Sequence, residues 1–278
     1  MTELKPYELL EAPAPRIRGP LRGLYAGNTR SVVARGLQVI AKNNWIVVMT
    51  GFFEPVFYLL SMGLGLGALI GSVSFYGADV PYAAYIAPAL MAVSAMNGAV
   101  YDSTMNVFFK MNFANLYQQM LSTSLGPLDV ALGEILLALF RGLLYASGFM
   151  VVTTLLGLNL SWTAILAIPA ALVIAFAFAS FGMAVTSYMK TFQHLDYVYF
   201  VMMPMFLLSA TFFPIEVYPQ GVQWVIQAMP LWHGVDMIRQ LTTGLIQPSI
   251  GIHLLYFGVM IVLGLWFTTA RLKSLFLR

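Results

Sequence analysis

Five charged side chains lie inside strongly apolar stretches of the sequence, and they are the first candidates for chemistry. Glu54, Glu134 and Arg141 lie well inside such stretches, whereas Asp102 and Asp129 lie near segment ends. A charge at the centre of a lipid bilayer costs roughly 2.5–3.5 kcal/mol on insertion scales, so a retained charge is either functional or paired. Glu54, Glu134 and Arg141 are therefore candidate pathway or inter-helix groups.

The spacing of two of these residues favours a shared role. Glu134 and Arg141 are seven residues apart, which places them on one face of a helix, two turns from each other. Two interpretations remain open for these residues and for Glu54: a polar stripe along a translocation path, or buried ion pairs between helices. For Asp102 and Asp129 we favour ion pairing, or snorkelling to the membrane interface.

The sequence lacks the motifs of metal binding, nucleophilic catalysis and nucleotide binding. There is no cysteine, and the three histidines, His194, His233 and His253, do not have the spacing of metal ligands. We interpret them as isolated interfacial residues and expect no metal site. The sequence contains neither a G-x-S-x-G motif nor a G-x-x-x-x-G-K-[ST] phosphate loop. We therefore expect no catalytic residues, no bound cofactor and no nucleotide site on this chain.

The composition requires a lipid-facing surface. Hydrophobic residues make up 60% of the chain and charged residues only 9%, against about 25% charged residues in soluble domains. A helix needs about 20 apolar residues to cross a membrane. Six segments meet this requirement and predict an all-α integral membrane protein with six transmembrane helices: Trp45–Ile70, Tyr82–Phe108, Leu128–Leu156, Trp162–Met189, Tyr197–Phe213 and Ile252–Ala270.

The basic residues predict the orientation. With the N-terminus inside, every Lys and Arg lies in the cytoplasm except Arg141, in the third span, and Arg239, in the last outer loop. Because cytoplasmic loops of membrane proteins are enriched in Lys and Arg, both termini are expected in the cytoplasm.

The sequence before the first span divides into two parts. Residues 1–20 are polar and proline-rich, lack the pattern of a signal peptide and predict a flexible cytoplasmic tail. Residues 21–44 alternate aliphatic and basic side chains at helical spacing, which predicts an amphipathic interfacial helix. We favour a topology anchor as its role. Residues 45–278 then form the transmembrane domain, whose first span carries Gly63, Gly67 and Gly71 at a spacing that permits close helix packing.

Two loops are unusual. The inner segment Phe109–Pro127 is polar and could present a short helix to a soluble partner. The outer segment Pro214–Pro248 is apolar for a loop, which predicts two short re-entrant helices split at Pro230, between the fifth and sixth spans. Irregular backbone at membrane depth requires burial in protein or a cavity.

In this order and spacing, the segments resemble the permeases of type 2 ABC exporters, over nearly the whole chain from Leu21. The closest resemblance is to nodulation-type lipo-oligosaccharide and daunorubicin-type drug export permeases. The residues that carry it are Phe53-Glu54-Pro55, Tyr85-Ile86-Ala87-Pro88, Tyr117-Gln118-Gln119-Met120, Leu128-Asp129-Val130, Gly133-Glu134, Arg141-Gly142, Phe212-Phe213-Pro214, Met229-Pro230-Leu231, His233 and Arg239.

The resemblance implies a mechanism. Two permease copies, or this chain and a close homologue, would form a pore in the bacterial cytoplasmic membrane with two cytosolic ATPase subunits, which would bind the ATP and Mg²⁺. The cargo would be amphipathic, a lipid-linked oligosaccharide, another glycolipid or a hydrophobic drug, and nucleic acid would have no role. The ATPase-coupling residues would be Phe113, Tyr117, Gln118 and Met120 in the 109–124 loop, and the outer gate would comprise Phe212, Phe213, Pro214, Pro230 and His233.

Two other classes of protein compete with an exporter. An ion-coupled secondary transporter or channel would show internal repeats with paired broken helices, and the two halves of this chain are not convincingly similar. A membrane-embedded enzyme would need a cluster of acid, base or metal-binding residues at one membrane face, which the sequence lacks.

Overall fold

The structure, a computed structural model, describes residues 25–42 and 53–276. The predicted tail, residues 1–20, lies outside the described residues, as do both ends of the predicted interfacial helix. In chain order the elements are α1 (Thr29–Lys42), the π-helical segment η1 (Leu59–Leu66), α3 (Gly67–Ile70), β1 (Ser72–Phe75), β2 (Ala78–Pro81), α4 (Tyr82–Tyr101), the π-helical turn η2 (Asp102–Asn106), α5 (Val107–Asn112), α6 (Leu116–Leu121), α7 (Pro127–Leu155), the 3₁₀ turn η3 (Trp162–Leu166), α8 (Ala167–Thr186), α9 (His194–Leu208), the 3₁₀ turn η4 (Ile215–Val217), α10 (Gln220–Ala228), α11 (Pro230–Thr243) and α12 (Ser249–Phe276).

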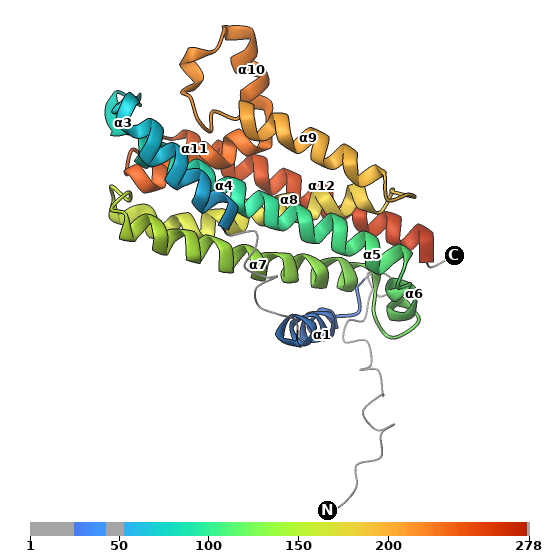
Figure 1. The fold of residues 1–278 in the computed structure, drawn as a ribbon. Helices are drawn as coiled ribbons and strands as arrows, with labels where there is room; N and C mark the ends of the chain where they lie inside the picture. The colour runs from blue at the N-terminus through green and yellow to red at the C-terminus, as the bar shows by residue number, and fades with distance from the viewer. Residues whose placement is uncertain (1–24, 43–52, 277–278) are drawn as a thin grey trace, which may run out of the picture.

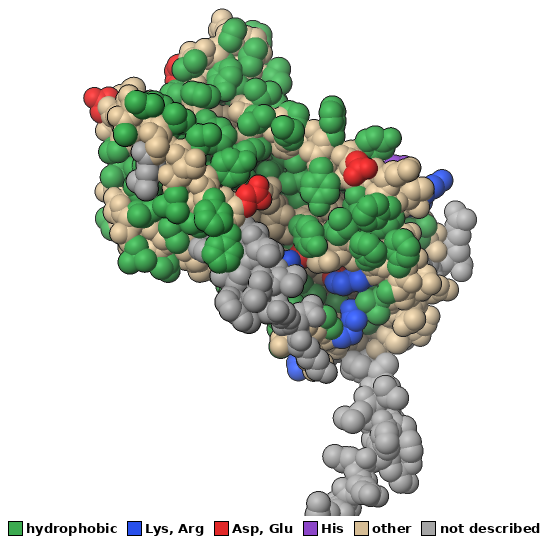
Figure 2. All heavy atoms as spheres, in the orientation of Figure 1, with side chains coloured by type: hydrophobic (Ala, Val, Ile, Leu, Met, Phe, Trp, Pro, Cys, Tyr) green, Lys and Arg blue, Asp and Glu red, His purple; other side chains and the backbone are tan. Residues whose placement is uncertain are grey.

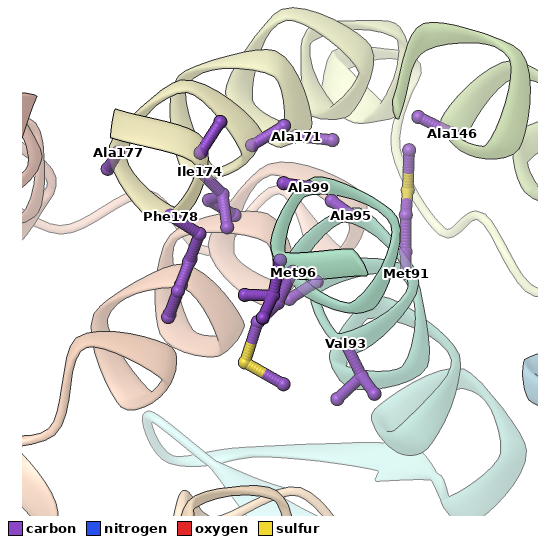
Figure 3. Close-up of a cluster of buried hydrophobic side chains, with 14 of the residues drawn as sticks. Met91, Val93, Ala95, Met96, Ala99, Ala146, Ala171, Ile174, Ala177 and Phe178 are labelled. Carbon is purple, nitrogen blue, oxygen red and sulfur yellow. The ribbon is translucent and has the colours of Figure 1, made fainter. Parts of the chain in front are cut away.

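Helix α4 is the centre of a helical bundle. It packs against η1, α7, α8 and α11 and is buried along nearly its whole length. Alanines allow this close approach: Met91 of α4 points toward Ala146 of α7, and Ala95 and Ala99 of α4 lie toward Ala171 of α8 (Figure 3). Helices α5 and α6 lie at one end of the bundle and α3 and α11 at the other, which we call the hairpin end (Figure 1).

Within residues 25–42 and 53–276, five helices are long and apolar enough to cross a membrane: Phe53–Ile70, Tyr82–Asn112, Pro127–Leu155, Trp162–Thr186 and Ser249–Leu275. The predicted fifth span, Tyr197–Phe213, corresponds to α9, which has only 15 residues. At 1.5 Å per residue it is about 22 Å long, shorter than a hydrocarbon core of about 30 Å. The structure therefore supports a multi-span helical membrane protein, and the sixth span stays a prediction.

The mostly helical structure agrees with the predicted all-α membrane protein, and the predicted outer loop after the first span contains a short β-hairpin. Strands β1 and β2 pair antiparallel with Val73 opposite Val80. Tyr76 and Gly77 at the turn have φ of 47° and 79°, the left-handed pair that a two-residue hairpin turn requires. Of the predicted packing glycines, Gly63 approaches Ala83 of α4, whereas Gly71, with φ of 74°, ends α3.

Helix α1 crosses α7, and in Figure 1 it is seen nearly end-on below that helix. Glycines make the crossing close. A Cβ atom on Gly133 of α7 would lie 2.5 Å from the Cβ of Val32, and one on Gly36 of α1 would meet the side chain of Leu137. The described part of the interfacial segment is therefore packed directly onto the third span.

The crossing gives a testable prediction. Gly133→Ala is expected to lower the free energy of unfolding by about 1–3 kcal/mol, because the added methyl group overlaps the Cβ and Cγ1 atoms of Val32, whose β-branched side chain is stiff. The measurement is unfolding in mixed detergent micelles followed by circular dichroism. Gly258→Ala on α12 is the matched control, since a Cβ atom there meets nothing within 4 Å. Equal stability of the two variants would contradict the close crossing.

Candidate functional site

A cavity of about 440 Å³ lies between four helical segments. Its wall combines polar and apolar side chains. The polar part comprises Glu54, Asn97, Arg141 and four tyrosines, Tyr58, Tyr101, Tyr145 and Tyr199, and the apolar part includes Leu90, Val93, Met202, Met203 and Phe206. Figure 2 shows that hydrophobic side chains cover most of the visible face of the molecule. A cavity of mixed character in such a surface suits a ligand that is itself amphipathic.

Glu54 gives this cavity an uncompensated negative charge. It precedes Pro55 in the first span, and its side chain is exposed at the cavity wall. Among the residues that the structure describes, none forms an ion pair with it. The carboxylate is therefore available to accept hydrogen bonds from a ligand.

Arg141 reaches the same wall from α7 and is held there by Asp102. The guanidinium Nε lies 2.9 Å from Asp102 Oδ2, and Asn106 donates to the other carboxylate oxygen at 2.6 Å. Asp102 begins the π-helical turn η2, which rotates the side chains that follow α4 relative to a regular helix. Such turns occur often at functional sites, and here the turn carries the carboxylate that pairs with Arg141.

Glu134 lies outside this cavity, so the structure does not bring it together with Glu54. It forms a salt bridge with Lys110 of α5 and is itself buried. The fully buried Tyr117 of α6 lies close by, and burial together with the Glu134 charge raises the pKa of its hydroxyl well above the ordinary value. Glu134 and Arg141 thus each tie α7 to the helices that follow α4, through separate partners.

Asp129 forms no ion pair among the described residues, in contrast to the ion pairing that we favoured. Its carboxylate is fully buried and accepts four hydrogen bonds. The donors are the backbone N–H groups of Ala26 (2.7 Å), Asn28 (2.9 Å) and Gly126 (2.9 Å) and the Thr29 hydroxyl (3.0 Å). Asp129 therefore fastens the start of α1 to the start of α7.

Comparison with known proteins agrees with this architecture. A family profile described as ABC-2 type transporter matches residues 28–242. The chain belongs to the ABC-2 transporter family. It is 30% identical over 233 residues to Nodulation protein J of Rhizobium leguminosarum bv. viciae, an alignment that covers 83% of this chain and 88% of that protein. It is 32% identical over 227 residues to Nodulation protein J of Rhizobium leguminosarum bv. trifolii, covering 81% and 85%. The expected relation to nodulation-type export permeases is thus confirmed.

In this ABC-2 permease the predicted coupling residues divide into two pairs. Phe113 and Gln118 are exposed, and the Phe113 ring joins an aromatic cluster with Phe108 and Phe109. Tyr117 and Met120 are buried, so they are placed to hold α6 in position rather than to touch a partner directly. Figure 2 shows Lys and Arg side chains gathered toward this end of the molecule.

The segment of the permease between α9 and α12 contains the predicted gate residues. Pro230 is the first residue of α11, and α10 and α11 meet there. Phe212 is buried and packs edge-on against Phe206 of the cavity wall at 5.3 Å, whereas Phe213 is exposed. Pro214 precedes η4, and His233 is buried on α11. Insertion of α10 and α11 into the membrane stays a prediction.

The interpretation of the histidines as isolated is wrong for two of the three. His233 of α11 and His253 of α12 are both buried, and their Nδ1 atoms lie 2.8 Å apart. Asp236 accepts from the far side of the His253 ring, at 2.9 Å from Nε2. The sequence offered one signal: Asp236 follows His233 by three residues and so shares its helix face.

Arg239 is a further buried residue whose role could not be read from the sequence. It donates to the backbone carbonyls of Tyr85, in the turn before Pro88, and of Ala210, both at 3.0 Å. Its guanidinium also stacks over the Tyr85 ring, 3.7 Å from the centroid. Arg239 therefore joins α11 to α4 and to the segment that follows α9.

Proposed function

We propose that this chain is the six-span permease subunit of an ATP-driven exporter in a bacterial cytoplasmic membrane, with both termini in the cytoplasm. Its cargo is an amphipathic molecule of the class of lipid-linked oligosaccharides, other glycolipids or hydrophobic drugs. The observation that carries this proposal is the cavity lined by Glu54, Arg141, tyrosines and methionines. Hydroxyl and carboxylate groups suit a sugar or amine headgroup, and the apolar wall suits an acyl chain or a ring system.

Coupling to ATP runs through the 109–124 loop to a separate ATPase subunit, which supplies the nucleotide and Mg²⁺ sites. Phe113 and Gln118 are exposed on this loop and form the contact in the proposal. Tyr117 and Met120 hold α6 against the bundle, and the Glu134–Lys110 salt bridge links α5, the helix before α6, to α7. A push on α6 then reaches the third span.

A second copy of the permease, or a close homologue, completes the pathway. The first span is poorly covered by its own chain, and Phe53, Phe57 and Tyr58 are exposed along it. Aromatic side chains of this kind beside an open polar cavity suit a protein neighbour as well as lipid. Two ATPase copies would serve the dimer, and α9 together with the residues up to Phe213 would supply the sixth span.

The test is reconstitution of the chain with its ATPase in proteoliposomes. ATP hydrolysis is expected to be stimulated by the permease and by a fluorescent glycolipid, and that lipid is expected to cross the bilayer only with ATP. Gln118→Ala is expected to abolish the stimulation. Tyr188→Ala, at an exposed position outside the 109–124 loop, is the control and is expected to preserve it. Movement that follows an ion gradient and ignores ATP would instead establish the secondary-transporter alternative.

Glu54→Gln is expected to weaken binding of a sugar-headed or amine-bearing cargo about 10–100-fold. The reason is that a hydrogen bond to a charged group contributes roughly 1.5–3 kcal/mol. The free energy of unfolding should hardly change, because the Glu54 side chain is exposed. Binding to the permease in nanodiscs measures the effect, and Glu216→Gln, exposed on η4, is the control. Unchanged affinity would remove Glu54 from the binding site.

A further inference from the structure

Three buried side chains form a hydrogen-bonded chain at the hairpin end of the bundle, away from the cavity. Asp236 Oδ2 lies 2.9 Å from His253 Nε2, and His253 Nδ1 lies 2.8 Å from His233 Nδ1. The exposed fractions of Asp236, His253 and His233 are 5%, 1% and 6%. Among the described residues, no group of three His, Cys, Asp or Glu side chains has the geometry of a metal site. The hydrogen bonds between Asp236, His253 and His233 therefore need another explanation.

The contact between the two imidazoles limits how many protons they hold. A hydrogen bond between two Nδ1 atoms needs one N–H donor and one free lone pair. If both rings were doubly protonated, two N–H groups and two positive charges would face each other at 2.8 Å. The contact therefore tolerates at most one positive charge on the pair.

The hydrogen bonds around the pair assign the shared Nδ1 proton to His253. Its Nε2 faces the Asp236 carboxylate, and although burial alone would raise the pKa of Asp236, hydrogen bonds from His253 and Gln240 hold it below its ordinary value. His233 makes its other hydrogen bond to the backbone of Gln227, so its Nδ1 accepts from His253. Burial and the neighbouring His253 lower the pKa of His233 to about 4, which keeps it neutral.

Few other titratable groups lie near enough to change this balance. Helices α8 and α10 and the turn η3, which also pack around α11, contribute no charged residue. Arg239 on α11 adds positive charge and opposes a further proton. The remaining neighbours are two carboxylates, two tyrosines of α4, one tyrosine of the hairpin and one of α12: Asp79, Glu216, Tyr82, Tyr85, Tyr76 and Tyr256.

The hydrogen-bonded side chains Asp236, His253 and His233 lie where several elements join. The Tyr76 hydroxyl of the hairpin donates to Asp236 at 3.2 Å, and Tyr256 of α12 stacks on the His233 ring with centroids 4.1 Å apart. The Tyr256 hydroxyl donates to the carbonyl of Ala228 at the end of α10. Loss of the contact between the histidines would therefore loosen the hairpin, α10 and α11 from the start of α12.

We propose that His233 and His253 form a proton-binding site at which a second proton breaks the contact between α11 and α12 and opens the hairpin end of the bundle. The closed state binds one proton fewer than the open state, in which His233 regains an ordinary pKa of about 6.5. Stability of the closed state is therefore fully present above about pH 6.5 and declines as the pH falls toward 4. None of the three side chains lines the cavity described above.

The direct test is nitrogen NMR of the full chain, labelled with ¹⁵N-histidine, in lipid nanodiscs from pH 8 to 4. The sequence contains only three histidines, and His194→Gln identifies the signal of the third. We expect one protonated and one unprotonated Nδ1 in the pair at pH 7.5, with His233 becoming charged only below about pH 5. An unprotonated Nδ1 on both rings at pH 7.5, or a His233 ring that titrates with an ordinary pKa of about 6.5, would overturn the proposal.

A distance measurement tests the opening. The natural chain has no cysteine, so Val225→Cys on α10 and Leu255→Cys on α12, both exposed, place two spin labels without background. Acidification should shift the distance distribution with the same midpoint as His233. His233→Gln, which keeps a hydrogen-bonding group but takes up no proton, should remove the shift, whereas His194→Gln should keep it. A shift that survives His233→Gln would contradict the assignment, and the NMR titration of the natural chain decides the matter if that variant does not fold.

Discussion

Arg141→Met is expected to lower the free energy of unfolding by about 3–5 kcal/mol, the usual cost of leaving a buried charge without its partner. Asp102 is almost enclosed and would keep only its hydrogen bond from Asn106. The measurement is unfolding in mixed micelles, together with ATP-driven transport. Both the stability and the transport activity should fall, because the same ion pair positions the cavity wall and ties α7 to the second span.

The partner substitution separates the two effects. In the double variant Arg141→Met with Asp102→Asn no charge is stranded, so most of the lost stability should return while transport stays low. A double variant no more stable than Arg141→Met would show that the ion pair does not determine the effect. Arg271→Met at the far end of α12 is the control for loss of an arginine, since among the described residues its side chain contacts a backbone carbonyl and a tyrosine face and no carboxylate.

Asp129→Ala is expected to destabilise the protein by about 3 kcal/mol or more. Three backbone N–H groups and one hydroxyl lose their acceptor at once, and hydrogen bonds to a charged acceptor contribute about 1.5–3 kcal/mol each. The start of α1 should detach from α7, so faster hydrogen exchange at residues 26–32 is the specific readout.

Asp196→Ala removes the same functional group from an exposed position on α9 and is the matched control. Asp129→Asn keeps one acceptor oxygen and should fall between the natural chain and Asp129→Ala. If α1 exchanged no faster in Asp129→Ala, the close packing at Gly36 and Gly133 alone would be holding it.

Local sequence was sufficient to predict most of the membrane architecture. Hydropathy depends only on neighbouring residues, and the segment Trp162–Met189 matches the helix Trp162–Thr186 closely. The split at Pro230 and the start of α7 near Leu128 were also predictable, because proline can begin a helix but lacks an N–H to continue one.

Contacts between distant residues were not predictable in this way. The donors to Asp129 lie about a hundred residues earlier in the chain. Helix α9 ends at Leu208, before the predicted end of its span, and Ala210 takes a φ of 54° with its carbonyl directed to Arg239. A single sequence contains no local signal for either pairing.

In the candidate site, too, local features were predictable from the sequence and contacts between distant residues were not. Helical spacing placed Glu134 and Arg141 on one face of α7, yet their partners, Lys110 and Asp102, follow from how α5 and η2 pack against it. The same reasoning treated His233 and His253 separately, because a loop and two helix ends lie between them.

The enclosure of α4 has a consequence for how such permeases diversify. A substitution in its cavity-facing residues, such as Val93 or Asn97, also disturbs a core shared with α7, α8 and α11. Another wall belongs to α9, where Tyr199 and Met203 are exposed. Mutational tolerance is therefore concentrated on α9, and a change of cargo during evolution, or in directed selection, should arise first among its residues.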